Sequence, residues 1–236
     1  MKKILLLSSD TAHHRYFINS IESNNIIFTK YFFETIHYEP SFKVGPIFER
    51  EEGHFESNNF FRSVSNNILD SKIIKVDSIN SDESIKKLNA IKPDLGIVFG
   101  TGKINNKVIS IFKDGLINVH RGLAEKYRGL DSDLWAIYHR DYDNIGVTIH
   151  MVDSVMDAGN IIFSEKLKIS SRMKTHQLRY YTTLMATDLI KSTIIQYLNN
   201  NLNHRVQSSK GRYYSFMPKE LKKIVNIRFN KYCEKL

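Results

Sequence analysis

The chain has 236 residues, of which 42% are hydrophobic and 25% are charged, and this composition is typical of a folded globular protein with one complete core. No apolar run approaches the roughly 18 residues that cross a bilayer, and the apolar start of the chain is too short for a secretory signal, so we expect no membrane partner. The single cysteine, Cys233, excludes an intrachain disulfide and a cysteine-cluster metal site and favours a reducing, cytoplasmic location, while the net charge of +9 raises the question of a nucleic-acid partner.

Hydrophobic periodicity predicts strands that alternate with helices along most of the chain. The strand-like segments are apolar runs at residues 3–8, 26–34, 72–76, 94–99, 115–120, 145–152 and 160–163. The helix-like segments are residues 11–24, 59–69, 81–91, 105–112, 131–142 and 174–200. Ser81 is the expected N-cap of its helix, and residues 40–58 lack a period and are expected to form a loop. The alternation predicts an α/β fold with a Rossmann-like, mostly parallel sheet and helices on both faces.

The residues after Asn200 are enough for a hairpin and a short helix. We therefore expect one main domain over residues 1–200 and a short C-terminal extension over residues 201–236. Its aromatic residues Tyr213, Tyr214 and Phe216 are suited either to stacking on a nucleotide base or to a subunit interface. A homodimer is accordingly one of our expectations.

Polar side chains stand at the end of the strand-like run 115–120 and in the loops that follow it. Asn118 and His120 share one face of that strand, because side chains two positions apart point the same way. An Asn N–H can donate to an oxyanion, a His can move a proton, and an Asp such as Asp157 can orient the imidazole. The alternative is structural: Asn118 caps a turn, His120 is a satisfied polar residue, and Asp157 begins a turn before Gly159. Spacing alone leaves both interpretations open.

Several short motifs occur in order along the middle of the chain. They lie at residues 118–120 (Asn-Val-His), 126–129 (Lys-Tyr-Arg-Gly), 146–150 (Gly-Val-Thr-Ile-His) and 156–159 (Met-Asp-Ala-Gly). In this order and spacing they resemble the catalytic domain of the folate-dependent formyltransferases, most of all the sugar N-formyltransferases. Methionyl-tRNA formyltransferase and glycinamide ribonucleotide formyltransferase are relatives in that family. The resemblance covers about residues 90–165 and implies that residues 1–200 are a formyltransferase catalytic domain.

The resemblance also implies roles for single residues. The catalytic residues of the family fall on Asn118, His120 and Asp157, with Asp153 as the competing carboxylate. The formyl donor and co-substrate is 10-formyltetrahydrofolate, and no metal is required. Its implied contacts are Phe99, Gly100, Gly102, Ile104 and Asp153. The expected substrate-binding residues, in the loop after His120, are Lys126, Tyr127 and Arg128.

Two features of the matched region fall outside these roles. The usual Leu-Pro of the family after the histidine is Leu123-Ala124 here, which leaves the shape of that loop open. His150 alternates with Ile149 and Met151 along a strand-like run. We expect His150 to be a packed strand residue.

The resemblance predicts an enzyme that formylates the amine of a nucleotide-linked amino sugar, such as a dTDP-4-amino-4,6-dideoxyhexose, for surface polysaccharide including lipopolysaccharide O-antigen. The turn at residues 8–15 lacks the glycines of the phosphate loop in glycinamide ribonucleotide formyltransferases. The residues after Asn200 are few for the barrel of methionyl-tRNA formyltransferases.

Two alternatives to this function stay open. The first is formyl transfer to another amine, namely an aminoacyl-tRNA, an amino acid or a peptide. The second is a non-catalytic module that binds folate or nucleic acid. Basic residues are spread along the chain, so we expect a nucleic-acid role to be the weaker interpretation of the net charge.

Overall fold

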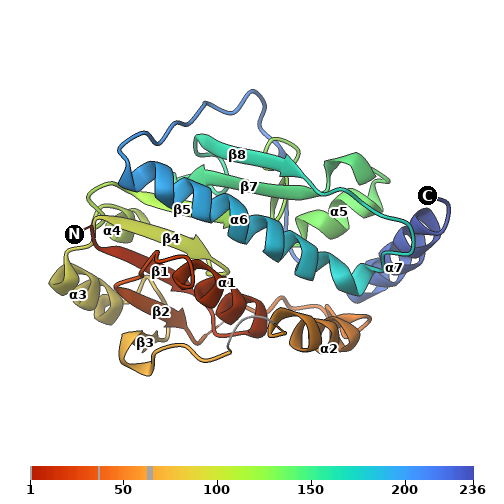
Figure 1. The fold of residues 1–236 in the computed structure, drawn as a ribbon. Helices are drawn as coiled ribbons and strands as arrows, with labels where there is room; N and C mark the ends of the chain where they lie inside the picture. Colours follow the sequence, from red (N-terminus) through yellow and green to blue (C-terminus); the bar gives the residue numbers. More distant parts are fainter. Residues whose placement is uncertain (1, 37, 63–65) are drawn as a thin grey trace.

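The predicted mostly parallel sheet is confirmed in the computed structural model, which describes residues 2–36, 38–62 and 66–236 (Figure 1). In this part of the chain the sheet has seven strands: β1 (Ile4–Ser8), β2 (Lys30–Glu34), β3 (Ile73–Val76), β4 (Leu95–Phe99), β5 (Leu116–His120), β7 (Gly146–Met151) and β8 (Ile161–Lys166). Their order across the sheet is β3-β2-β1-β4-β5-β7-β8, and β7 runs against both of its neighbours. The chain changes direction across the sheet between β1 and β4, and open α/β sheets bind ligands at such a point.

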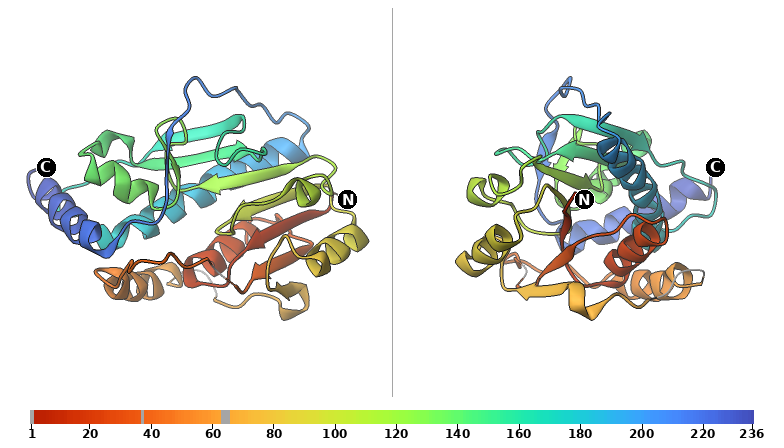
Figure 2. Two further views of the ribbon diagram at one scale, coloured as in Figure 1. Left: turned by 180° about the vertical axis from the view of Figure 1, so that it is seen from behind. Right: turned by 60° about the vertical axis from the view of Figure 1, so that its left-hand side comes forward.

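Helices cover both faces of the sheet, as predicted (Figures 1 and 2). One layer consists of α1 (Ala12–Glu22) and α6 (Leu178–Leu198), and the other of α3 (Asp82–Ile91) and α4 (Asn106–Ile109). Because both faces are covered, β1 and β4 are buried over their whole length, and Ser8 at the end of β1 is their one polar residue. No helix of the described residues combines the length and the apolar character that crossing a bilayer requires.

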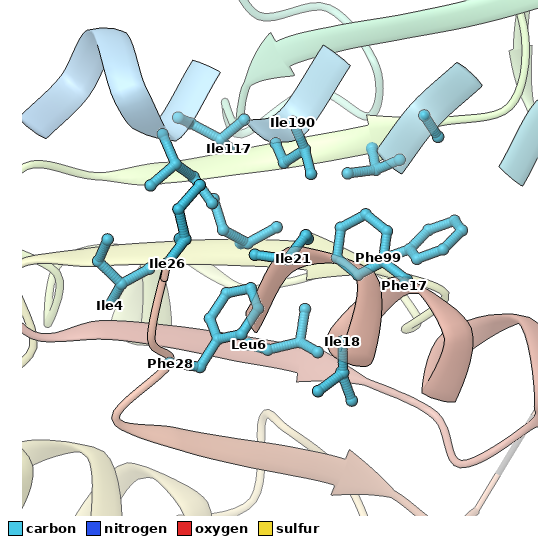
Figure 3. Close-up of a cluster of buried hydrophobic side chains, with 14 of the residues drawn as sticks. Ile4, Leu6, Phe17, Ile18, Ile21, Ile26, Phe28, Phe99, Ile117 and Ile190 are labelled. Carbon is cyan, nitrogen blue, oxygen red and sulfur yellow. The ribbon is translucent and has the colours of Figure 1, made fainter. Parts of the chain in front are cut away.

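The largest core lies between the sheet and the layer of α1 and α6. Figure 3 shows Phe17 and Ile21 of α1 above Leu6 of β1, with Ile190 of α6 close to Ile117 of β5. All five side chains are fully buried. This packing fixes β5, and with it the position of the polar residues at its end.

The predicted helix cap is found in the structure, whereas two predicted helices are shorter than expected. The Ser81 cap of α3 is confirmed, since the side chain of Ser81 accepts a hydrogen bond from the backbone N–H of Ser84 at 3.2 Å. The predicted helices at 105–112 and 131–142 are shorter in the structure. They correspond to α4 and to α5 (Ser132–Tyr138).

Helix α2 (Glu49–Phe60) corrects two predictions, a loop at residues 40–58 and a helix at residues 59–69. After Phe60, residues 61–62 and 66–69 are not helical, and residues 63–65 lie outside the described residues. The buried side chains of α2 are Glu52, Glu56 and Phe60, at intervals of four. Because two of these three are charged, the helix has a regular inner face but no hydrophobic period.

The C-terminal part corrects the predicted hairpin. Strand β9 (Arg212–Tyr214) pairs in parallel with β6 (Tyr127–Gly129), the strand that follows the first site motif. Parallel strands cannot be joined by a hairpin turn, so the chain reaches β9 by a long path over β8, where Arg205 bridges to Ile161 (Figure 1). The terminal helix α7 (Lys219–Cys233) then packs on α5.

One partly buried guanidinium attaches α2 to the rest of the protein. Arg179 of α6 donates to both carboxylate oxygens of Glu56, at 2.6 and 2.9 Å, and also lies 2.8 Å from Glu52. Two carboxylates therefore share one positive charge. Burial raises the pKa of the Glu52 carboxyl to about 7, although Arg179 acts in the opposite direction.

This shift predicts a pH dependence of stability. Between the ordinary value of 4.5 and about 7, folded Glu52 keeps a proton that the unfolded chain has lost, so the free energy of unfolding should fall as the pH rises through that window. In Glu52→Gln this fall should be smaller than in the wild type. Denaturant unfolding at about pH 5, 6.5 and 8 measures it, and the exposed Glu51→Gln is the control. If the free energy of unfolding depended on pH in the same way in all three proteins, the raised pKa of Glu52 would be contradicted.

Candidate active site

A cavity of about 470 Å³ opens at the carboxyl ends of β4 and β5. This is the edge of the sheet at which a doubly wound α/β fold binds its ligands, beside the reversal of strand order. The loop after β4, the end of β5, the start of α5 and the loop after β7 line it, and Tyr38, Tyr213 and Ser215 complete its wall.

Most of the predicted site residues meet in this cavity. The three predicted catalytic residues line it. So do the five residues predicted to bind the folate, which are Phe99, Gly100, Gly102, Ile104 and Asp153. Asn118 and His120 point from the same face of β5, and Asp157 faces them from the loop after β7.

The carboxylate of Asp157 lies close to the side chains of Asn118, His120 and His150. Its Oδ2 accepts a hydrogen bond from the backbone N–H of Gly129 at 2.7 Å and lies 3.6 Å from Nδ1 of His120. Its Oδ1 accepts from Nδ2 of Asn118 at 3.2 Å and lies 3.3 Å from Nε2 of His150. Asp157 itself is in the left-handed region, with φ of 52°.

The charge on Asp157 is maintained by these neighbours. Burial alone would raise the pKa of the carboxyl, but the two imidazoles and the N–H of Gly129 outweigh burial and hold the pKa of Asp157 well below its usual range. The carboxylate is therefore ionised at every pH near neutrality. It can stabilise an imidazolium beside it.

The backbone decides which nitrogen of His120 can take a proton. Nε2 of His120 lies 2.8 Å from the carbonyl oxygen of Tyr127. A carbonyl only accepts, so Nε2 carries the hydrogen and Nδ1 of the neutral ring keeps its lone pair. Nδ1 is also the nitrogen beside Asp157, at 3.6 Å. His120 can thus act as a base through Nδ1, next to the charge that would stabilise its protonated form.

His150 lies in the site. The prediction of a packed strand residue describes its burial but not its place in the cavity wall. It is only 2% exposed, yet it lines the cavity and lies within 3.3 Å of both Asn118 and Asp157. The antiparallel register of β5 and β7 places it directly opposite Asn118. The alternation of residues along β7 indicates the face of His150, but only the register shows what it meets.

The three residues predicted to bind substrate do not line this cavity. Lys126 is exposed outside it, and the ring of Tyr127 lies in a buried cluster with other aromatic residues. Arg128 is buried, where its guanidinium donates to the carbonyl oxygens of Gly211 at 2.6 Å and Met156 at 3.1 Å. Arg128 therefore ties the loop that carries Asp157 to the C-terminal segment.

Other charged side chains lie around Asn118, His120 and Asp157. Lys103, Arg121, Asp131 and Asp133 line the same cavity. In the described part of the chain, no group of three or more His, Cys, Asp or Glu side chains is arranged to hold a metal ion.

Comparison with known proteins gives a consistent family and two kinds of relative. A family model described as Formyl transferase matches residues 56–190. Methionyl-tRNA formyltransferase from Borrelia garinii subsp. bavariensis is 33% identical over 165 residues, which make up 65% of this chain and 52% of that protein. The chain thus spans about half the length of this curated relative.

Two solved structures share the fold. A 4-N formyltransferase from Francisella tularensis has a TM-score of 0.65 at 23% identity, over 91% of this chain and 76% of that one. The formyltransferase PseJ from Anoxybacillus kamchatkensis was solved in complex with UDP-4,6-dideoxy-4-formamido-L-AltNAc and tetrahydrofolate. It has a TM-score of 0.57 at 18% identity, over 94% of this chain and 89% of that one.

The backbone at Gly129 predicts a sharp contrast between two glycine substitutions. Gly129 has φ of 89°, and an added Cβ would lie 2.0 Å from the carbonyl oxygen of Tyr214. Gly129→Ala should therefore lower Tm by roughly 4 °C or more, equivalent to about 2 kcal/mol or more. Gly53→Ala in α2, where an added Cβ has nothing within 4 Å, should leave Tm unchanged or raise it. Equal melting temperatures for the two variants would show that the backbone at Gly129 does not require glycine.

Proposed function

Because the chain belongs to the formyl transferase family, we propose that it transfers the formyl group of 10-formyltetrahydrofolate to the amine of a nucleotide-linked amino sugar. The observation that carries the proposal is a single cavity in which Asn118, His120 and Asp157 meet. PseJ, which shares the fold over most of both chains, was solved with a nucleotide sugar and a folate together. That pairing supports the same two ligand classes here.

In this proposal the folate occupies the part of the cavity between the loops after β4 and β7. Phe99 and Ile104 are buried and apolar, which suits a flat ring system. Gly102 leaves the backbone open to close approach, since an added Cβ would meet only an oxygen of Glu34 at 3.9 Å, and the Asp153 carboxylate can accept hydrogen bonds from ring N–H groups.

The acceptor occupies the part of the cavity beyond His120. Arg121 lines it and has no ion pair with a described residue, so its guanidinium suits a phosphate group of the nucleotide. Tyr38 and Tyr213 are 74% and 51% exposed at the cavity, and their rings offer stacking surfaces for a base. Asp133 can accept hydrogen bonds from sugar hydroxyl groups.

The chemistry then follows from the positions of the side chains. The neutral amine attacks the formyl carbon, and an N–H of Asn118 stabilises the negative charge that develops on the formyl oxygen. Nδ1 of His120 takes the proton that the amine loses and returns it to the departing folate nitrogen as the bond to the formyl carbon breaks. Asp157 stabilises the intermediate imidazolium at 3.6 Å.

Formyl transfer to an aminoacyl-tRNA is the second candidate, because the curated relative with 33% identity is a methionyl-tRNA formyltransferase. The net charge of +9 also favours a polyanionic partner. The two acceptors differ in their response to salt. Binding of tRNA should weaken steeply as salt is added, whereas binding of a nucleotide sugar should weaken much less.

A panel assay tests the proposal. The protein is supplied with 10-formyltetrahydrofolate and with dTDP- or UDP-linked 3-amino and 4-amino sugars or charged initiator tRNA, and release of tetrahydrofolate is followed. We expect turnover with an amino sugar, and a loss of about 100-fold or more in His120→Ala. The exposed His54→Gln is the matched control and should keep full activity. Turnover with tRNA alone would select the second candidate.

The same assay checks the role of His120 as a base. The amine and the imidazole base both act in their neutral forms, so the pH profile should have an acid limb on which activity rises with pH. A flat profile between about pH 6 and pH 9 would contradict this role.

A further inference from the structure

Both amide hydrogens of Asn118 are already engaged within the site. Nδ2 of Asn118 lies 3.1 Å from Nε2 of His150 and donates to Oδ1 of Asp157 at 3.2 Å. An amide nitrogen has two hydrogens, so these two contacts occupy it completely. To donate to a developing oxyanion, Asn118 must release one of them.

The tautomer of His150 shows how this release can occur. Nδ1 of His150 lies 2.8 Å from the carbonyl oxygen of Met151, so Nδ1 carries a hydrogen. In the neutral ring Nε2 is then an acceptor and takes a hydrogen from Asn118. In the imidazolium Nε2 is a donor, cannot accept from Asn118, and faces Oδ1 of Asp157 at 3.3 Å.

We propose that His150 is a positioning residue whose protonation frees one amide hydrogen of Asn118 for the oxyanion. Protonated His150 donates to Asp157, and Asn118 turns one N–H to the reacting carbonyl group. Neutral His150 accepts this amide hydrogen of Asn118, so that Asn118 cannot donate it to the oxyanion. The catalytic part of this inference rests on the proposed function, whereas the link between His150 and Asn118 does not.

The surroundings of His150 favour a reversible exchange of this kind. Asp157 faces it from the loop after β7, and His120 of β5 lies with its ring centroid 6.4 Å away. The other charged groups of the cavity are Asp153, Lys103, Arg121, Asp131 and Asp133. Asp157 is the carboxylate in direct contact with Nε2 of His150. The cavity gives the ring access to water and protons although it is almost wholly buried.

Nuclear magnetic resonance of the protein without substrate tests the link directly. The side-chain amide signals of Asn118 and the imidazole nitrogens of His150 are followed through a pH titration. We expect the Asn118 signals to shift with the same midpoint as Nε2 of His150. In His150→Gln, which places a non-titrating amide near that nitrogen, this shift should be absent.

Three outcomes would overturn the proposal: an Asn118 signal that does not change with pH, a shift that persists in His150→Gln and so comes from His120, or a His150 ring that does not titrate. His150→Asn replaces the glutamine variant if the latter does not fold, because it keeps a donor for the Met151 carbonyl and removes Nε2. His54→Gln is again the control, on the exposed side of α2.

Steady-state kinetics test the consequence for catalysis. In the wild type, kcat should fall above the midpoint of His150 by about tenfold per pH unit, and in His150→Gln this alkaline fall should disappear. If His150 had only a structural role, His150→Gln would lower kcat at every pH, and the shape of its pH profile would match that of the wild type. Absence of turnover in the wild type would count against the proposed function alone, since the magnetic resonance titration needs no acceptor.

Discussion

The buried carboxylate of Asp157 is the group on which the arrangement of the cavity depends. Removing a charge from water costs on the order of several kcal/mol unless the charge is paired and hydrogen-bonded. Here the partners come from three strands: Asn118 and His120 from β5, Gly129 from β6, and His150 from β7. One anion therefore links the three strands at the edge where the cavity opens.

The loop that carries Asp157 is itself held from outside the main sheet. Its left-handed backbone, with φ of 52°, is unfavourable for a residue other than glycine. The side-chain amide of Gln207 donates to the carbonyl oxygens of Asp157 at 2.8 Å and Gly159 at 2.9 Å, and Arg128 links Met156 to Gly211. The segment after α6 is thus a support of the site.

The parts of the fold that could be predicted are those with a hydrophobic signal of their own. Strand β4 and β1 up to Ser8 are continuous apolar runs, and the helices α1 and α3 have apolar periods. Helix α2 could not be predicted, because its inner face bears Glu52 and Glu56 and their partner Arg179 is remote in sequence. Strand β9 was misjudged for the same reason: its partner β6 lies far from it along the chain. The meeting of Asn118 and Asp157 could be predicted from the order of the motifs. The contact of His150 could not, because it depends on the register of β5 with β7.

The parallel pairing of β6 with β9 has a consequence for the order of events during protein synthesis. The ribosome makes β6 and the loop that carries Asp157 long before it makes Gln207, Gly211 and β9, which hold them. A nascent chain that ends before residue 205 has the strands of the main sheet but lacks the contacts that fix Asp157. The sheet can therefore form first, and the loop that carries Asp157 is fixed only when the later segment has crossed β8 and docked.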